Sequence, residues 1–372
     1  MKLITLLIFN ILFSLTGSAQ KTYSISGTVT NGKGEKLASV TVFVDGTSRA
    51  TQTDADGKYA LVNVGPGNLT LVTSRLGYVS ERKPLLLSNR TAAGPSVSIV
   101  TLDFTLQDKS IALKEVKIGN DSKRAELLQK FRIKFLGFTA NALSCEILNT
   151  ELLEFTTIKQ SFLASSSDFL IIENKNLGYR IRYLLKNFSY NSKTTITSYN
   201  GDCIFEELKG SKSQQLQWAE NRRKAYEGSF MHYLRCLYNG SLPQTKFRTL
   251  EFINDPGGDP EKRTVKKDLV DMRKYVSRVD STFVKLATKE KFLVMYGDKV
   301  ERVMDVINEF GMLPDWKVFQ KDQVKRSEFN LYLDHTFIDK SGNYLDYRSY
   351  LLEGFWGSLQ MGDRLPFSYS PE

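Results

Sequence analysis

Histidine and cysteine are scarce in this sequence of 372 residues, which contains two histidines and three cysteines. Neither histidine begins a His-x-x-Glu pair, because Tyr-Leu-Arg follows His232 and Thr-Phe-Ile follows His335. The cysteines, Cys145, Cys203 and Cys236, have spacings that fit no zinc motif. We therefore expect no metal ligand. We also expect buried free thiols, with a Cys203–Cys236 disulfide as the alternative.

Sequence motifs of common enzyme chemistries are also missing. There is no Gly-x-Ser-x-Gly elbow, no phosphate-binding glycine loop and no dinucleotide-binding fingerprint. His232 precedes Cys236 by one helical turn, but such neighbours are usually packing partners rather than a catalytic pair. We expect no catalytic residue and no cofactor. A hydrolase that uses two carboxylates stays open, because its geometry is spatial and the chain has 41 aspartates and glutamates.

No block of the sequence carries charge of a single sign. The net charge of +10 arises from 51 basic and 41 acidic residues that alternate along the chain. Such mixing is typical of a solvated surface rather than of a stripe that binds phosphates. We expect no nucleic-acid partner, and a weak attraction to anionic lipid or polysaccharide stays open.

Long hydrophobic runs are absent after residue 20. Before it, Lys2 precedes the apolar run Leu3–Leu15, and small residues occupy positions 17–19. This order predicts a signal peptide over residues 1–19, cleaved before Gln20. The run is too short to cross a ~30 Å hydrocarbon core, which needs about 20 residues. We thus expect an exported chain whose mature part has no transmembrane span, with peripheral outer-membrane association as an alternative.

Residues 23–107 show the pattern of short strands separated by turns. Apolar and polar residues alternate, and glycine-containing turns recur at intervals of roughly ten residues. Such turns include Asn31-Gly32, Asp45-Gly46 and Gly65-Pro66-Gly67. The pattern predicts a small seven-stranded β-sandwich. Because this part contains no cysteine, apolar burial must stabilise it.

Four segments of this region carry a resemblance to a known family. In order they are Ser26–Val29, Leu37–Val42, Thr53–Tyr59 and Leu76–Tyr78. Through them, residues 20–108 resemble the carboxypeptidase-regulatory-like domain, a transthyretin-like (prealbumin-like) sandwich also grouped with carbohydrate-binding-like folds. The resemblance implies no peptidase activity, because the zinc ligands of the carboxypeptidases that carry such a domain are missing.

The resemblance also implies a cellular location. In Bacteroidota this domain commonly follows a signal peptide, including at the front of TonB-dependent outer-membrane receptors. It therefore implies a protein of the periplasm or outer-membrane periphery of a Gram-negative cell. Residues Ala112–Ile118 resemble the TonB-contacting box that follows the domain in those receptors. We expect a plain linker strand there instead, within a linker over residues 109–121.

The remaining region, residues 122–372, has a mixed pattern that predicts an α+β domain. We expect a helix over residues 122–136, strands between Phe162 and Phe205, and one long helix from Ser211 or Ser213 to Tyr238. This region also resembles exported Bacteroidota proteins named only for their N-terminal domain, which implies no activity, through the segments Phe135–Thr139, Leu177–Ile181, Lys209–Ser211 and Leu351–Trp356.

Two acidic segments rich in turn residues raise the question of a calcium site. Asp54 and Asp56 precede Gly57, but Lys58 stands where a calcium loop needs an oxygen ligand. We expect a tight turn there, with Gly57 at positive φ. The second segment, Asp255–Glu261, predicts an exposed loop, with a cation site as the alternative.

Aromatic residues give the remaining indication of function. Two sets alternate with basic residues or cluster near the end of the chain. Exposed aromatic side chains can stack on sugars or anchor a protein partner. The candidate binding surface consists of Tyr179, Tyr183, Tyr347, Tyr350 and Trp356. The competing interpretation places these residues in a packed sheet core.

The sequence therefore predicts a mostly β protein in which a transthyretin-like sandwich precedes an α+β domain with one long helix. We expect a non-enzymatic binding or scaffolding protein of the cell envelope, with an envelope protein or glycan as partner. One alternative is an envelope glycan or peptide hydrolase that uses carboxylates of the C-terminal domain. Another is an accessory of a TonB-dependent uptake system.

Overall fold

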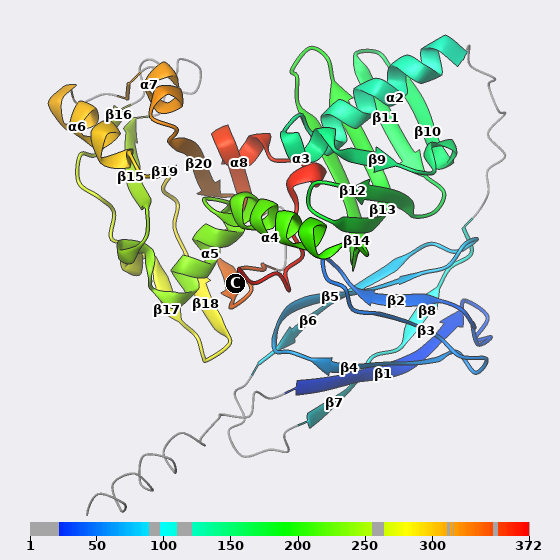
Figure 1. Ribbon diagram of the computed structural model, residues 1–372. Helices are drawn as coiled ribbons and strands as arrows, with labels where there is room; N and C mark the ends of the chain where they lie inside the picture. Colours follow the sequence, from blue (N-terminus) through cyan, green and yellow to red (C-terminus); the bar gives the residue numbers. More distant parts are fainter. Residues whose placement is uncertain are drawn as a thin grey trace, which may run out of the picture.

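The computed structural model describes residues 22–88, 97–109, 121–254, 264–310, 313–314, 316–344 and 349–371. Four predicted features lie outside these residues: the signal peptide 1–19, the segment 112–118, the acidic loop 255–261 and Tyr347. The rest of the chain forms a mostly β structure with several sheets, which confirms the predicted fold class. Figure 1 shows a sandwich beneath two further groups of strands and helices.

The N-terminal part is a β-sandwich of two facing sheets. Alternate residues of its strands point inward, and the core between the sheets includes Ile25, Val29, Val42, Leu71 and Phe104. One sheet contains β1 (Thr22–Asn31), β4 (Lys58–Val64), β7 (Val97–Thr101) and β8 (Phe104–Leu106). The other contains β2 (Thr41–Val44), β3 (Ala50–Gln52), β5 (Gly67–Ser74) and β6 (Glu81–Leu87). The structure thus has eight strands where the sequence predicts seven.

A second sheet follows, with helix α2 (Asp121–Leu136) across one face (Figure 1). Phe131 and Phe135 of α2 pack edge-on against Phe188 and Tyr183 of the sheet, with ring centroids 4.9 and 5.0 Å apart. These contacts explain why a helix with this spacing of aromatic residues forms here. The sheet consists of β9 (Cys145–Ile147), β10 (Leu153–Ile158), β11 (Ser161–Ser166), β12 (Leu170–Asn174), β13 (Tyr179–Asn191) and β14 (Thr197–Glu207). Short helices α3 (Ala140–Leu143) and η1 (Thr150–Leu152) border it.

The predicted long helix is two helices, α4 (Lys212–Tyr226) and α5 (Phe230–Asn239). The chain breaks at Gly228, whose φ of +72° is left-handed and incompatible with a continuing α-helix. The Ser229 side chain then caps α5 by accepting a hydrogen bond from the His232 backbone N–H at 3.1 Å. The capping serine of α4 is Ser211, one of the two candidates. The prediction was wrong about continuity because neither Gly228 nor Ser229 alone forbids a helix.

The third group contains two sheets and the remaining helices. One sheet has the order β16 (Thr264–Val265), β15 (Phe247–Asn254), β19 (Phe292–Tyr296), β20 (Lys325–Leu331) and β22 (Tyr350–Glu353). The smaller sheet contains β17 (Val276–Arg278), β18 (Phe283–Leu286) and β21 (Thr336–Asp339). The helices are α6 (Val300–Phe310), α7 (Trp316–Lys321), α8 (Gly354–Ser358), η2 (Leu242–Gln244) and η4 (Met272–Lys274). Helix η6 (Met361–Asp363) packs instead against α2 and α3 of the second group. Helix α5 and Trp356 share one core of this group, and α6 belongs to another.

The sandwich packs directly on both other groups. Backbone hydrogen bonds join the turn after β2 to β14, from Gly46 N–H to Cys203 O and from Phe205 N–H to Thr47 O, both at 2.9 Å. On the other side, Asp339 Oδ2 accepts a hydrogen bond from the Asn68 backbone N–H at 2.7 Å. A small apolar core spans the first of these contacts. The sandwich is therefore held on two sides, and the domain boundaries expected from the sequence stay a prediction.

Candidate functional site

The aromatic residues selected from the sequence do not form an exposed surface. Tyr179, Tyr183, Tyr350 and Trp356 retain 3, 1, 7 and 4% of their accessible surface, so all four are buried. Tyr347 lies outside the described residues. The burial follows from strand alternation, which turns the tyrosines of β13 into the core and the arginines between them outward. The competing interpretation, a packed sheet core, describes their positions.

Two of these four residues meet at a cavity. Tyr183 and Trp356 belong to different cores, yet both line the space where the three parts of the molecule join. Tyr179 lines a separate shallow depression beside α4. Tyr350 packs inside the core around α5.

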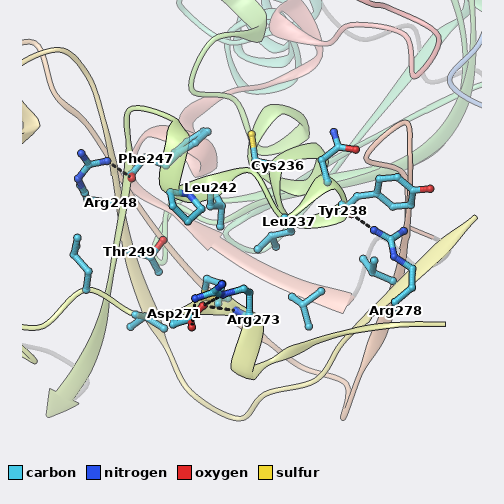
Figure 2. A pocket seen from close by; sticks show the side chains of 18 of the residues that line it. Cys236, Leu237, Tyr238, Leu242, Phe247, Arg248, Thr249, Asp271, Arg273 and Arg278 are labelled. Carbon is cyan, nitrogen blue, oxygen red and sulfur yellow. Dashed lines mark hydrogen bonds and ion pairs between the residues drawn. The ribbon is translucent and has the colours of Figure 1, made fainter. Parts of the chain in front are cut away.

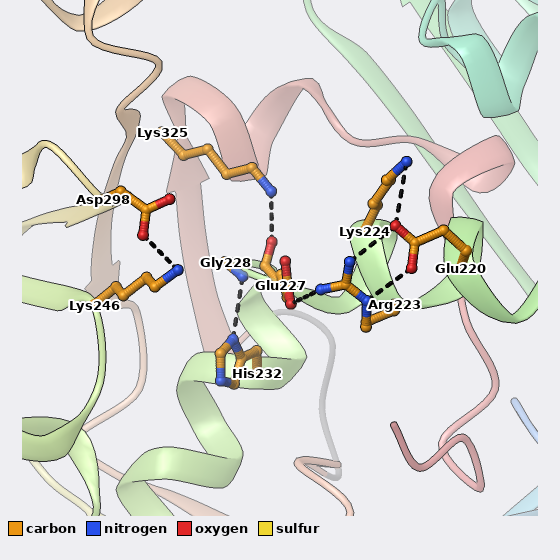
Figure 3. Close-up of polar contacts among 9 residues, drawn as sticks. All are labelled: Glu220, Arg223, Lys224, Glu227, Gly228, His232, Lys246, Asp298 and Lys325. Carbon is orange, nitrogen blue, oxygen red and sulfur yellow. Dashed lines mark hydrogen bonds and ion pairs between the residues drawn. The ribbon is translucent and has the colours of Figure 1, made fainter. Parts of the chain in front are cut away.

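His232 is a half-buried structural residue (Figure 3). Its Nδ1 atom accepts a hydrogen bond from the Gly228 backbone N–H at 3.1 Å. Its ring contacts Tyr226 and Phe247, with centroids 4.7 and 5.0 Å away. Burial lowers the pKa of His232 to about 4, so the imidazole is neutral at physiological pH. His335 is exposed and lies in the turn before β21.

The cysteines are three buried free thiols, which confirms the expectation and leaves no Cys203–Cys236 disulfide. Burial raises the pKa of Cys145, Cys203 and Cys236. A catalytic cysteine needs a lowered pKa, because the thiolate is the nucleophile. With His232 bonded to its own helix end, the structure gives no support to a Cys236–His232 pair.

The predicted turn at Gly57 is confirmed. Asp54 Oδ1 accepts hydrogen bonds from the backbone N–H groups of Asp56 and Lys58 at 2.9 and 2.8 Å, and Gly57 has a φ of +71°. Within the described residues, no group of three or more histidine, cysteine or acidic side chains could hold a metal ion. No helix in this part of the chain has the length and apolar character needed to cross a membrane.

A cavity of about 620 Å³, which we call the larger cavity by comparison with the one described next, lies beside α5 and the β17–β18 hairpin (Figure 2). Its floor is apolar, and three arginines stand around it. Each arginine has a partner: Arg248 bonds to Glu301 and to the Phe247 carbonyl, Arg273 to Asp271, and Arg278 to the Tyr238 carbonyl. Since these charges are already satisfied, the cavity offers little selectivity for a polar ligand.

The junction cavity, as we name the second, has a volume of about 330 Å³. It opens where the sandwich, the β13–β14 sheet, α5 and the C-terminal segment meet. Volumes of about 300–1,000 Å³ are typical of small-molecule sites. Its walls include seven aromatic residues, and its lining contains Asp45, Tyr183, Tyr199, Phe230, Tyr344, Trp356, Asp363, Arg364 and Phe367.

Arg364 is the unusual residue of the junction cavity. It follows η6, lines the cavity and is exposed. Among the described residues, no acceptor takes a hydrogen bond or forms an ion pair with its guanidinium group. Desolvation opposes ionisation of Arg364, but its pKa is raised overall by the nearby Cys203, Tyr199, Tyr183 and Asp45. The cavity thus contains a permanent cation with no hydrogen-bond or ion-pair partner in the part of the chain that the structure describes.

A charge network borders the same cavity. Arg82 of β6 pairs with the buried Asp202 at 2.8 Å and lies 3.6 Å from Asp45, while Lys186 pairs with Asp202 at 2.9 Å. Asp45 Oδ1 also accepts the Cys203 backbone N–H at 2.8 Å. Burial first, and the charge of Asp202 second, raise the pKa of Asp45 to about 6. The sandwich therefore contributes an acidic group to one wall of the cavity.

Sequence reasoning did not find Arg364, Asp45 or Asp202. Arg364 lies in an irregular segment with no periodic pattern, and Asp45 resembles an ordinary turn residue before Gly46. Their significance comes from the docking of three chain segments far apart in the sequence. No local signal could have revealed it.

The fold of the first part defines it as a transthyretin-like β-sandwich, and comparison with known families agrees. Residues 25–118 match the model of the CarboxypepD_reg-like domain, which confirms the resemblance of this part of the chain. A curated relative, "TonB-dependent receptor P39" of Formosa agariphila, is 31% identical over 106 residues. The match covers 28% of this chain and 9% of that protein, so the chain spans less than a tenth of its relative.

Solved structures give only distant likenesses. A putative membrane-associated protein of unknown function from Bacteroides fragilis matches with 14% identity, 45% coverage of this chain, 65% of that one and a TM-score of 0.20. A putative carbohydrate binding protein from Bacteroides uniformis matches with 10% identity, coverages of 52 and 81%, and a TM-score of 0.18. For 3-chlorocatechol 1,2-dioxygenase from Rhodococcus opacus the values are 15% identity, coverages of 24 and 61%, and a TM-score of 0.20. These scores are too low to support a functional conclusion.

Proposed function

We propose that this chain is a non-enzymatic binding protein of the cell envelope, and that its ligand occupies the junction cavity. The observation that supports this most is the unpaired Arg364 guanidinium among aromatic walls. Arg364 is exposed at the cavity rather than buried, so its guanidinium donors are available to a ligand that enters there. The site needs all three parts of the molecule, since each supplies a wall.

The envelope location rests on the first quarter of the chain. The CarboxypepD_reg-like domain and the resemblance to part of a TonB-dependent receptor support it, as does the predicted signal peptide. In this proposal the sandwich has a scaffolding role. It holds the β13–β14 sheet and the β21 turn at a fixed spacing, and its Asp45 turn closes one side of the cavity.

The competing hydrolase hypothesis needs two free carboxylates that face a substrate. The junction cavity contains Asp45 and Asp363, and one oxygen of each accepts hydrogen bonds from protein donors, while the buried Asp363 Oδ2 has no partner among the described residues. Asp45 accepts the Cys203 N–H at 2.8 Å, and Asp363 Oδ1 accepts Thr139 Oγ1 at 2.8 Å and Asn141 Nδ2 at 3.0 Å. This arrangement favours binding over hydrolysis. The TonB-accessory hypothesis depends on residues 113–118, which lie outside the described residues.

The test is a binding and turnover screen with the chain from Gln20 to Glu372. A panel of neutral glycans, acidic sugars, small organic acids and peptides is titrated by calorimetry, and each mixture is then assayed for new reducing ends or amines. We expect saturable binding of at least one member without turnover. Turnover that disappears in Asp45→Asn or Asp363→Asn would establish the hydrolase instead. Binding by no member of the panel would reject the proposed function.

A further inference from the structure

Resting on the proposed function, we propose that the ligand of the junction cavity is a small organic carboxylate with a single negative charge and a compact ring or apolar body. Its carboxylate pairs with Arg364, and its body lies against the aromatic walls. Three properties of this ligand follow from the cavity: the sign of its charge, the number of its charges and its shape.

The sign of the ligand charge follows from Arg364. A guanidinium has five N–H donors and stays protonated at any physiological pH. Among the described residues none of these donors has a protein acceptor, and the side chain is exposed at the cavity. A planar fork of donors matches a carboxylate in a bidentate geometry, which is stronger and more directional than a neutral hydrogen bond. An anion therefore satisfies the cavity best.

The single charge follows from the acidic groups that share the cavity. Asp45 and Asp363 both line it, whereas the other nearby cation, Arg82, is already committed to Asp202 and Asp45. One unpaired cation thus faces two protein carboxyl groups. A phosphate dianion would meet this negative field with its second charge uncompensated, while a carboxylate would not. Asp45 of the sandwich thereby selects against highly charged anions.

The body of the ligand follows from the walls. Phe230, Tyr344, Trp356 and Phe367 all line the cavity, and ring faces of this kind bind flat or compact groups by offset stacking. Two tyrosines, Tyr183 and Tyr199, lie close enough to Arg364 to influence its pKa. Their hydroxyl groups make no hydrogen bond to another described residue. Burial raises the pKa of both, so they remain protonated donors for a ligand oxygen.

The experiment titrates the chain from Gln20 to Glu372 with matched probes. Benzoate and glucuronate carry the proposed chemistry, benzamide and glucose are the neutral counterparts, and inorganic phosphate and phenyl phosphate test a doubly charged anion. We expect the carboxylates to bind, with neutral and phosphate probes weaker by about tenfold or more, which corresponds to about 1.4 kcal/mol. Arg364→Gln should weaken carboxylate binding about tenfold, and Arg364→Lys should retain part of it.

Arg273→Gln is the matched control, because Arg273 is an exposed arginine at the larger cavity. It should leave binding unchanged. Melting temperature and near-ultraviolet circular dichroism check that each variant is folded. Carboxylate binding that survives Arg364→Gln, or that is lost in Arg273→Gln, would overturn the inference, as would tighter binding of phosphate than of benzoate. If neutral glycans bind while carboxylates do not, the inference fails and the binding function stands. If no probe of either panel binds, both fail.

Discussion

At the scale of single residues, most polar groups are satisfied by neighbours, and two charged side chains are distinctive at one cavity. His232, the cysteines and the arginines of the larger cavity all have ordinary structural surroundings. Arg364, by contrast, is a cation without a hydrogen-bond or ion-pair partner among the described residues, and Asp45 is a carboxylate whose ionisation is opposed by burial. Both lie at the junction cavity, and that coincidence gives the site its chemical character.

Asp45 should make stability depend on pH. Its pKa is raised from 3.8 in the unfolded chain to about 6 in the folded one, so the folded state binds the proton more tightly. Its contribution to stability is therefore greatest at low pH and declines as the pH rises through about 6. We expect Asp45→Asn, which keeps an acceptor for the Cys203 N–H, to raise the melting temperature by a few degrees at pH 7.5 and to have little effect at about pH 3, where Asp45 is protonated in both the folded and the unfolded chain.

The control for this prediction is Asp298→Asn, at a carboxylate whose side chain is 80% exposed. It should change the melting temperature little at either pH. A loss of stability in Asp45→Asn at pH 7.5, or an equal effect at both pH values, would show that ionised Asp45 does not strain the junction.

At the scale of elements, the break between α4 and α5 positions one wall of the junction cavity. Gly228 turns the chain so that α5 can place Phe230 in the cavity. A Cβ atom at this position would lie 2.5 Å from the Tyr296 ring and 2.9 Å from the Lys325 side chain. The break therefore depends on glycine for both its backbone angle and its close packing.

Gly228→Ala should lower the free energy of unfolding by about 2 kcal/mol or more, through left-handed strain and overpacking together. Gly240→Ala is the matched control, since Gly240 has a φ of +67° but no atom within 4 Å of an added Cβ. It should show the strain alone, about 1 kcal/mol. Urea unfolding followed by circular dichroism measures both. Equal losses in the two variants would contradict the role given to the Tyr296 and Lys325 contacts.

The elements also show how far local sequence signals reach. The helix over 122–136, the turn at Gly57 and the strand pattern of the sandwich follow from periodicity and turn chemistry, and the structure confirms them. The break between α4 and α5 could not be predicted, because it depends on distant contacts with Tyr296 and Lys325. The prediction of an exposed aromatic surface was wrong for a similar reason. Alternation along a strand shows that tyrosines share one face of the sheet, but not which face other elements cover.

At the scale of the whole molecule, the sandwich is a fixed part of the site. Asn68 on β5 donates hydrogen bonds from Nδ2 to the backbone carbonyls of Phe337 and Asn343, both at 3.0 Å. The backbone carbonyl of Asn68 in turn accepts a hydrogen bond from Asn343 Nδ2 at 2.7 Å. With the contacts of Gly46 on the other side, these bonds hold the sandwich against both C-terminal groups.

Asn68→Ala should loosen this docking, because two buried carbonyls lose their donor, at a cost of about 1–3 kcal/mol. Hydrogen exchange measured by mass spectrometry should become faster in the Asp339–Asn343 turn, while the α2 region stays protected. Gln52→Ala, at an exposed position on the same sandwich, is the control and should leave exchange unchanged. Unaltered exchange in the turn of Asn68→Ala would argue against a rigid junction.

The most direct test of the central claim is a crystal structure of the chain from Gln20 to Glu372 with benzoate. The account predicts benzoate in the junction cavity, with its carboxylate within hydrogen-bond distance of the Arg364 guanidinium and its ring against Trp356, Phe230 or Tyr344. Benzoate in the larger cavity instead, or a junction cavity that stays free of benzoate with Arg364 paired to a protein carboxylate, would contradict it.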